Sequence, residues 1–284
     1  HHDLGTAYAT FTGYRNDDFR PFIYKTIDFG ESWSDISSDL PDGPINVARE
    51  HHDNPNLLFV GTDFGVFTSI DGGESWASMK GNMPTAPVHD MKIHARANDL
   101  VVGTHGRGIY IADLTPLAEM SEDLLTTDSH FFQPESKVRW VAPDFTNYGS
   151  SNFEGESEAA GILLYYYLSD DVDEDITFTV YQGQFLIYEI EADGEAGLHH
   201  VTWNMQKRLE RTAEEQASAR SGGGRGGGSG GRGRGTTGIS AEDRARFVFS
   251  EAPIGEYRVV MTVGPQTFEH TVSILKDEWW QERR

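Results

Sequence analysis

One eight-residue pattern occurs twice in this chain and constrains its fold more than any other feature. Residues 26–33 read T-I-D-F-G-E-S-W, and residues 69–76, which lie 43 positions further on, read S-I-D-G-G-E-S-W. In a tight hairpin an Asp carboxylate accepts backbone N–H groups across the turn, and Gly supplies a positive φ. A Trp just past such a turn is large enough to anchor the hairpin between packed sheets. The repeated pattern therefore predicts a pair of structural hairpins, one repeat apart.

Strand-like segments recur with nearly the same period. The related segments are separated by 42 or 43 residues: 58–62 and 100–104, 65–69 and 108–112, 44–45 and 87–88. Short β-branched or aromatic strands split by Gly, Asp and Asn turns predict one four-stranded antiparallel unit per repeat, and this period is typical of β-propeller blades. We expect the strands of the complete unit at 45–50, 57–62, 65–70 and 75–79. The unit before it lacks its first strand, and the unit after it lacks its fourth.

The hairpin pattern resembles the Asp-box of the bacterial neuraminidase (BNR) repeat family, a β-propeller family of sialidases, sortilin-type receptors and xyloglucanase-type glycosidases. The resemblance implies an all-β fold in which residues 1–114 form about two and a half four-stranded blades. In that family the Asp is structural rather than catalytic. The structural set implied for this chain is Thr26, Asp28, Gly30, Ser32, Trp33, Ser69, Asp71, Gly73, Ser75 and Trp76.

The number of repeats in residues 1–114 is too small to close a ring, because propellers close with about four to eight blades. Open flanks would expose unpaired strand edges and apolar faces. We therefore expect the missing blades as partners, supplied by an N-terminal region of the same protein or by another chain. The chain starts at a strand-like segment without a methionine, which predicts that it is the C-terminal piece of a longer protein.

The second half of the chain predicts a separate β unit. Residues 115–158 are expected to form a connector with short helical turns, short strands at 131–132 and 138–141 and a loop over 147–158. Residues 277–284 are expected to form a C-terminal tail. Seven strand-like segments predict a β-sandwich over residues 159–276: 162–168, 176–181, 185–191, 197–204, 245–249, 255–263 and 266–275. Residues 197–204 (G-L-H-H-V-T-W-N) and 253–259 (P-I-G-E-Y-R-V) resemble strand signatures of the immunoglobulin-like domain of the flagellar-hook-cap type.

Residues 207–240 interrupt this unit with an insertion. Its first part, 208–220, is rich in Glu, Ala and Arg and is compatible with a helix, and its second part is a Gly tract with interspersed Arg. Such a tract cannot bury enough apolar surface to order itself, which predicts a disordered loop. The tract also resembles arginine-glycine segments that contact RNA, but it lacks interleaved aromatic residues for base stacking. Nucleic acid is therefore not an expected partner.

The composition excludes several classes of protein. The formal net charge of −22 repels nucleic acid and anionic lipid over most of the surface. The chain has no cysteine, which excludes a disulfide framework and thiol catalysis. No run approaches the roughly 18 apolar residues of a membrane span. The combined layout resembles large exported bacterial proteins, which implies a secreted, periplasmic or cell-surface location.

The hairpins that join the second and third strand of each repeat are the expected ligand site. They open at the end opposite the Asp-box hairpins, and this is the face that binds substrates in the resembling sialidases and glycosidases. The loop at 12–20 is longer than its counterparts and rich in groups that hold polar ligands. The ligand-binding candidates are Tyr14, Arg15, Asp17, Asp18, Arg20, Asp63, His105 and Arg107.

Catalysis within these residues is an open alternative. Glycoside hydrolysis needs two carboxylates at a set separation, which Asp17 or Asp18 together with Asp63 could supply. Sialidase-like chemistry would recruit Tyr14 as nucleophile and the nearby arginines. The sequence does not fix the separation of these carboxylates, and no family motif for the sialidase-like site is present, so no catalytic residue is assigned.

Histidines and an acidic run raise the question of a metal. His89 and His94 lie five positions apart in a strand and point to opposite faces, while His51 and His52 are expected to be solvated turn residues. The acidic run at 170–175 lacks the Gly and the distal Glu of an EF-hand loop and predicts an acidic hairpin tip instead. We expect no metal and no cofactor.

Two functions from different classes remain. The leading hypothesis is a binding or scaffold module of an exported bacterial protein that recognises protein, peptide or glycan. The alternative is part of a sialidase- or xyloglucanase-like glycoside hydrolase whose catalytic blades lie in the missing region.

Overall fold

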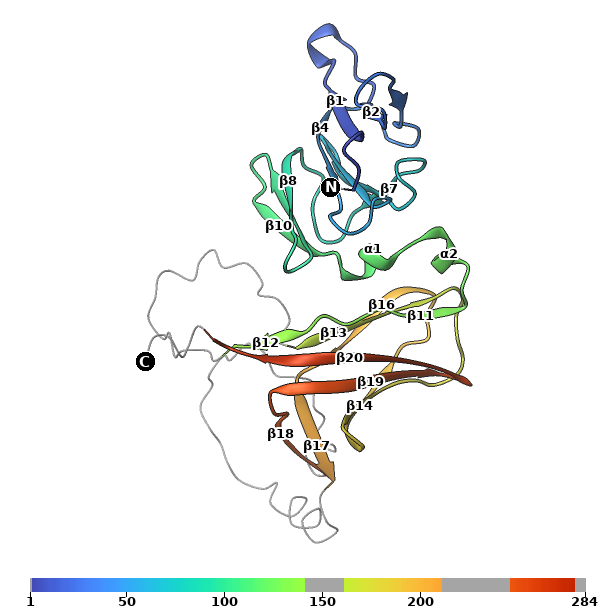
Figure 1. Cartoon of the computed structure of the whole chain (residues 1–284), viewed down its shortest axis with the longest axis vertical. Helices are drawn as coiled ribbons and strands as arrows, with labels where there is room; N and C mark the ends of the chain where they lie inside the picture. The colour runs from blue at the N-terminus through green and yellow to red at the C-terminus, as the bar shows by residue number, and fades with distance from the viewer. Residues whose placement is uncertain (1, 141–160, 211–245, 279–284) are drawn as a thin grey trace. The chain divides into compact units, whose positions relative to one another are not determined.

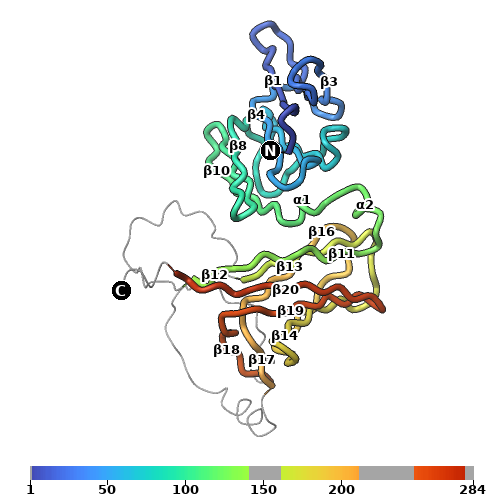
Figure 2. The backbone as a smooth tube through the Cα atoms, in the orientation of Figure 1, coloured from blue at the N-terminus to red at the C-terminus, as the bar shows by residue number. Residues whose placement is uncertain are grey.

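The computed structural model describes residues 2–140, 161–210 and 246–278. The chain divides into two compact units, His1–Thr127 and Asp128–Arg284 (Figures 1 and 2). Within the described residues both units are built almost entirely of antiparallel strands, which confirms the predicted all-β class. The helices are short, namely η1 (Tyr14–Asn16), α1 (Thr115–Glu119) and α2 (Glu122–Leu125), and none is long and apolar enough to cross a membrane.

The first unit contains three antiparallel sheets that follow one another along the chain. The first sheet consists of β1 (Ala7–Phe11), β2 (Phe22–Thr26) and β3 (Ser34–Asp35). The second sheet consists of β4 (Ile45–Glu50), β5 (Leu58–Thr62), β6 (Gly65–Ser69) and β7 (Ala77–Met79). The third sheet consists of β8 (Val88–His94), β9 (Asp99–Thr104) and β10 (Ile109–Asp113). The predicted strands of the complete repeat coincide with β4 to β7 within two residues.

Equivalent positions of the repeat make the contacts between neighbouring sheets. Leu58 and Val60 of β5 face the first sheet, whereas Leu100 and Val102 of β9 face the second sheet. All four side chains are almost completely buried. The 42-residue spacing between these strands therefore places an equivalent pair of apolar residues at each contact between sheets. Each sheet packs against the preceding sheet with the equivalent face.

Each Asp-box hairpin is closed by its own side chains. The Asp71 carboxylate accepts hydrogen bonds from the backbone N–H groups of Glu74 and Ser75, both at 3.0 Å, and from the hydroxyls of Ser69 and Ser75. Gly73 donates its N–H to Ser69 Oγ at 2.8 Å and has a φ of 100°. Burial alone would raise the pKa of Asp71, but the hydrogen bonds outweigh it and lower the pKa to about 2.

The first hairpin repeats this arrangement. Asp28 accepts hydrogen bonds from Thr26 Oγ1 at 2.7 Å, from Ser32 N at 2.9 Å and from Ser32 Oγ at 2.6 Å. These hydrogen bonds, with that from the Ser32 hydroxyl as the largest cause, lower the pKa of Asp28 to about 2. Both carboxylates are thus used within their turns.

Asp71→Ala should destabilise the first unit by about 1–3 kcal/mol, because it leaves hydrogen-bonding groups of the turn without their acceptor. Urea denaturation of the full chain at pH 7, with hydrogen exchange of residues 65–79 to assign the transition, measures the effect. The matched control is Asp42→Ala, which removes an exposed loop carboxylate and should change the free energy of unfolding by less than about 0.5 kcal/mol. Equal effects of the two substitutions would contradict a structural role for Asp71.

The second unit has two main sheets that share one core. One sheet has the order β11-β13-β16 and the other β12-β20-β19-β14-β15, with a separate hairpin β17-β18 (Figure 1). The core includes Leu164, Phe178, Trp203, Tyr257 and Val259, all at most 1 % exposed. The strand bounds are β11 (Ser129–Phe131), β12 (Lys137–Arg139), β13 (Ile162–Leu168), β14 (Ile176–Gln182), β15 (Phe185–Ala192), β16 (Gly197–Trp203), β17 (Gln206–Glu210), β18 (Phe247–Glu251), β19 (Gly255–Val263) and β20 (Gln266–Lys276).

Two stretches differ from the sequence-based expectation. The connector expected at 115–158 divides between the units, because β11 pairs with β13 and β12 pairs in parallel with β20, both in the second unit. The sequence predicts that the insertion starts at 207 and is compatible with a helix from 208, but Gln206–Glu210 is a strand paired with β18. The reason is tertiary: the Arg208 guanidinium lies 4.2 Å from the centroid of the Phe247 ring on the partner strand. The rest of the insertion and the predicted loop before 159 lie outside the described residues.

Candidate functional site

Three connections of the first unit hold the residues predicted to bind a ligand. Residues 12–21 join β1 to β2, Asp63 and Phe64 join β5 to β6, and residues 105–108 join β9 to β10. In an antiparallel sheet successive hairpins alternate between the two ends. These connections therefore lie at the ends of their sheets opposite the Asp-box hairpins.

Asp63 is tied to the neighbouring sheet through Asn46. Asn46 Nδ2 donates to Asp63 Oδ1 at 3.1 Å and to the carbonyl oxygen of Val88 at 3.1 Å. Asn46 belongs to β4 and Val88 to β8, so this amide fixes the Asp63 carboxylate against the start of the third sheet. Beside it the ring of Phe64 is 52 % exposed. The tip of this hairpin thus offers a carboxylate and an aromatic ring together.

His105 reaches the same stretch of β8 from the third sheet. Its backbone N–H donates to the carbonyl oxygen of Pro87 at 2.8 Å, and its ring stacks on that of His89 with centroids 4.9 Å apart. The hairpin is closed by Thr104 Oγ1, which donates to the Gly108 carbonyl at 2.6 Å. Asp63 and His105 therefore both converge on residues 87–89, one through Asn46 and one directly.

The long loop of the first sheet uses its charged groups internally. Arg20 donates to both carboxylate oxygens of Asp18, at 3.0 and 2.7 Å, and this pairing lowers the pKa of Asp18. Arg15 Nε donates to Tyr14 Oη at 3.2 Å. Asp17 ends η1 with a left-handed φ of 56°. No hydrogen bond joins this loop to Asp63 or His105 in the described part of the chain.

The candidate residues thus separate into two groups. Asp63, through Asn46, and His105, directly, are both linked to residues 87–89, and exposed Arg107 lies on the same hairpin as His105. Tyr14, Arg15, Asp18 and Arg20 form a self-contained loop. Asp18, one member of the carboxylate pair considered for glycoside hydrolysis, is bound in two places by Arg20.

Sequence reasoning missed Asn46 and the place of His89 in this site. Both follow the repeated Pro-aliphatic pair, at Pro44-Ile45 and Pro87-Val88, so they occupy equivalent positions 43 residues apart. That repeat was the available signal. Because β4 and β8 lie side by side, the residue after each pair sits at the same end as the strand-two to strand-three hairpins.

His51 differs from the expectation of a solvated turn residue, because it is only 1 % exposed. Its Nδ1 accepts the backbone N–H groups of Asp53 and Asn54, both at 3.2 Å, so the ring proton must sit on Nε2. Nε2 lies 2.7 Å from Asn98 Oδ1 in the β8–β9 turn and donates to it. His51 therefore fastens the second sheet to the third. Within the described residues, no group of three or more His, Asp or Glu side chains is placed to hold a metal ion.

Acid should weaken the contact between these sheets through His51. Burial is the largest cause that lowers the pKa of His51 below its ordinary value of 6.5. Among the nearby titratable groups, His52 and His2 also lower this pKa, whereas Asp53 raises it. The unfolded chain therefore binds a proton at His51 more tightly than the folded chain does. The contribution of neutral His51 to the free energy of unfolding is complete above pH 6.5 and decreases as the pH falls below 6.5, by at most about 1.4 kcal/mol per pH unit. Hydrogen exchange of residues 45–62 at pH 7 and pH 5 measures this. His51→Gln should remove this pH dependence, whereas the control His94→Gln, at an exposed residue, should retain it. Equal pH profiles in the unsubstituted chain and both variants would contradict the role of His51.

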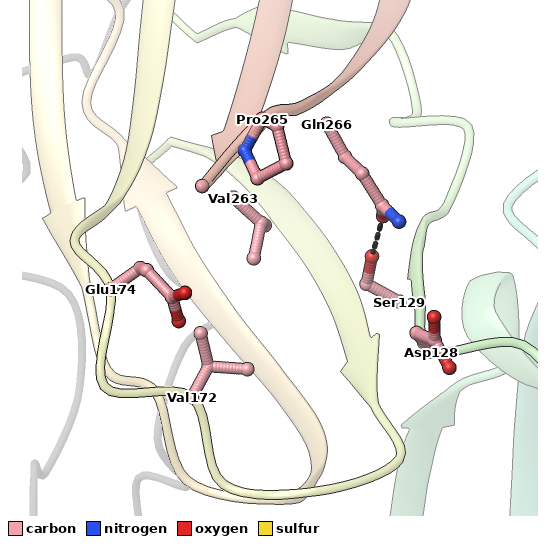
Figure 3. A pocket seen from close by; sticks show the side chains of 8 residues that line it. Asp128, Ser129, Val172, Glu174, Val263, Pro265 and Gln266 are labelled. Carbon is pink, nitrogen blue, oxygen red and sulfur yellow. Dashed lines mark hydrogen bonds between the residues drawn. The ribbon is translucent and has the colours of Figure 1, made fainter.

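The second unit has a surface pocket that the sequence did not predict. Its volume is about 250 Å³, and it is lined by Asp128, Ser129, Val172, Glu174, Val263, Gly264, Pro265 and Gln266. Figure 3 shows Glu174 and Val172 on one wall and Ser129 and Gln266 on the other, and Ser129 Oγ donates to Gln266 Oε1 at 2.8 Å. Pockets for small molecules usually measure about 300–1,000 Å³. The volume of this pocket lies just below that range.

Comparisons with known proteins give only distant likenesses. No protein-family model matches the chain, and no curated protein matches it. Among solved structures, an ancestral GH74 enzyme is 11 % identical with a TM-score of 0.31, covering 96 % of this chain and 22 % of its own length. The GH74 xyloglucanase from Xanthomonas campestris is 11 % identical with a TM-score of 0.33, and the match covers 96 % of this chain and 37 % of the xyloglucanase. The extracellular domain of a putative one component system from B. thetaiotaomicron is 10 % identical with a TM-score of 0.27, and the match covers 90 % of this chain and 28 % of that domain.

The chain thus spans between 22 % and 37 % of the length of these structures. Because every TM-score is below 0.5, the likenesses neither add to the fold given by the strand pairing nor bear on function.

Proposed function

We propose that the first unit is part of a BNR-type β-propeller and that the chain is a binding module of an exported bacterial protein, with a glycan as its ligand. The observation that carries the proposal is the convergence of Asp63 and His105, from different sheets, on residues 87–89. In a propeller, hairpins at one end of successive blades surround a common face, and such loops are where function is placed on a rigid scaffold. The repeated packing of the three sheets supports this reading.

The groups at this point suit a sugar. A sugar presents hydroxyls that need both donors and acceptors, and apolar ring faces that stack on aromatic side chains. Asp63 supplies an acceptor, while the imidazoles of His89 and His105 each offer a donor and an acceptor. Phe64, half exposed beside Asp63, supplies the apolar surface. A peptide could use the same groups, which makes it an outcome of the test.

Within this proposal the second unit is an immunoglobulin-like domain. Its two resembling sequence signatures, around Trp203 and Tyr257, meet in the core, where the ring centroids lie 5.0 Å apart. The unit would act as a rigid support or spacer.

The test is an oligosaccharide array probed with the labelled full chain, followed by calorimetry on the best binder. Asp63→Asn and His105→Ala should each weaken binding at least tenfold, about 1.4 kcal/mol, the order expected when a polar contact to a ligand is lost. The bound sugar should be recovered intact. The control Asp39→Asn alters an exposed loop carboxylate and should leave affinity unchanged. Unchanged affinity in both site variants, or selective capture of peptides on a parallel peptide array, would contradict a glycan site here.

A further inference from the structure

We call the side of a sheet that faces the preceding sheet of the unit its incoming side. In the second and third sheets this side is covered by the preceding sheet, whereas in the first sheet it is open. In the second sheet this side carries Leu58, Val60 and Trp76, which are 2 %, 0 % and 7 % exposed. The strand pairing places Ala7 and Ala9 of β1 where β5 has Leu58 and Val60, because Ala7 opposes Thr26 as Leu58 opposes Ser69. Ala7 is exposed, and Trp33, the counterpart of Trp76, is 45 % exposed.

The covered hairpin shows what such a face receives from its neighbour. Trp76 Nε1 donates to the carbonyl oxygen of Ile36 in the first sheet at 2.7 Å. A Cβ on Gly73 would lie only 2.8 Å from Ile36 Cδ1 and 3.3 Å from Ile36 Cβ, so the Ile36 side chain packs directly against this glycine. Ser38 Oγ donates to the Glu74 carbonyl at 2.9 Å, and Lys25 Nζ donates to the Gly72 carbonyl at 3.2 Å. The neighbour thus supplies one acceptor, one aliphatic side chain and two donors.

The first hairpin carries the same groups without these contacts in the described part of the chain. Trp33 replaces Trp76, Gly30 replaces Gly73, and Glu31 and Phe29 replace Glu74 and Gly72. A Cβ on Gly30 would meet within 4 Å only Trp33 of its own hairpin, and Phe29 is 81 % exposed. The first repeat therefore has the receiving surface of the second, and no described residue covers it.

We infer that the incoming side of the first sheet binds a further sheet of the same repeat type. This inference rests on the proposed propeller and names its partner at one face. The occupant presents, on the segment that follows its outermost strand, a backbone carbonyl to Trp33 Nε1, an aliphatic side chain against Gly30 and a hydroxyl or ammonium to the carbonyls of Glu31 and Phe29. The partner is thus defined by its contacts as well as by its fold.

A second copy of this chain fits the face less well. Among the described residues, the outgoing side it could offer is that of the third sheet, where Ile109 and Ile111 are 73 % and 68 % exposed. In the first sheet the carbonyl and the aliphatic contact come from Ile36, which directly follows β3, the outermost strand of that sheet. In the third sheet the chain continues from β10 into α1 and has no such segment in the described residues. Each copy also carries a formal charge of −22, which opposes close association.

An extended version of the chain can supply the occupant through a link of nearly natural length, because six residues (1–6) precede Ala7 where seven (51–57) separate Glu50 from Leu58. Residues 51–53 read H-H-D after Glu50, and residues 1–3 also read H-H-D. Placing a second copy of residues 1–50 directly before His1 therefore reproduces the natural Glu50–His51 junction. The added segment brings a β1–β3 sheet and a β4 strand that can complete the first sheet of the original chain.

In this extended chain, hydrogen exchange of residues 26–36 of the original copy should slow at least tenfold, and the indole N–H of Trp33 should become protected. The matched control carries Ile36→Asp in the added copy only and should lose most of this protection. No slowing in the extended chain, or equal slowing in the control, would overturn the inference.

A second measurement separates the competing occupant. Sedimentation equilibrium of the unextended chain should show a monomer, and self-association abolished by either Trp33→Glu or Ile109→Glu would assign the face to a second copy and overturn the inference. Binding of oligosaccharide at Asp63 is measured independently on the unextended chain, so failure of the glycan proposal leaves these readouts unaffected.

Discussion

Trp76→Ala should lower the free energy of unfolding of the first unit by about 3–5 kcal/mol, the usual cost of removing a buried Trp or Phe ring. Trp76 is 7 % exposed and packs with Ile23, Leu40, Ile45, Leu58 and Val60 between the first and second sheets. Its loss also leaves the Ile36 carbonyl without its indole donor. Urea denaturation of the full chain at pH 7, with hydrogen exchange of residues 45–62 to assign the transition, measures the effect.

The repeat provides the matched control for this substitution. Trp33→Ala removes the same side chain from the same hairpin position, but Trp33 is 45 % exposed and its indole packs against no neighbouring sheet in the described residues. The cost should stay below about 1 kcal/mol, as for most surface substitutions. Trp76→Phe should fall between the two, since it keeps most of the ring and loses the hydrogen bond. Similar losses for Trp76→Ala and Trp33→Ala would show that the hairpin itself, and not the sheet-to-sheet contact, requires the tryptophan.

The parts of the fold that the sequence predicted are those fixed by local chemistry. The strands of the second sheet follow from short β-branched or aromatic runs between Gly and Asp turns, and in each Asp-box hairpin the Asp carboxylate finds its hydrogen-bond donors within the eight residues of the pattern. The long loop at 12–20 also behaves locally, since Arg20 pairs with Asp18 two positions away.

The features that the sequence did not predict depend on partners far along the chain. His51 is adjacent to turn residues, but its burial is set by Asn98, 47 positions away. The strand β17 is rich in charged residues and has weak strand propensity, and its pairing with β18 brings Arg208 onto Phe247. Asn46 donates to both Asp63 and the Val88 carbonyl, and the second of these contacts depends on the packing of β4 beside β8. Local patterns carry no information on these contacts.

Trp203→Ala should be the most damaging single substitution in the second unit, at about 3–5 kcal/mol. Trp203 ends β16 with its side chain 0 % exposed, and its ring meets Tyr257 of β19 edge to face, with centroids 5.0 Å apart. Since β16 and β19 belong to the two different sheets, this pair joins both halves of the core.

The Trp203 indole also fixes a turn. Its Nε1 donates to the Gln206 carbonyl at 2.8 Å across Met205, which has a left-handed φ of 56°. Trp203→Phe keeps an aromatic ring of smaller size but not this donor, and loss of the hydrogen bond alone should cost about 1–2 kcal/mol. The control Trp140→Ala removes a ring that is 67 % exposed in the same unit and should cost less than about 0.5 kcal/mol. Denaturation followed by hydrogen exchange of residues 176–182 and 255–263 assigns the transition. If Trp203→Phe proved as damaging as Trp203→Ala, the turn rather than the core contact would be the main role of Trp203, and the sequence signature that contains it would mark a turn instead of a packing position.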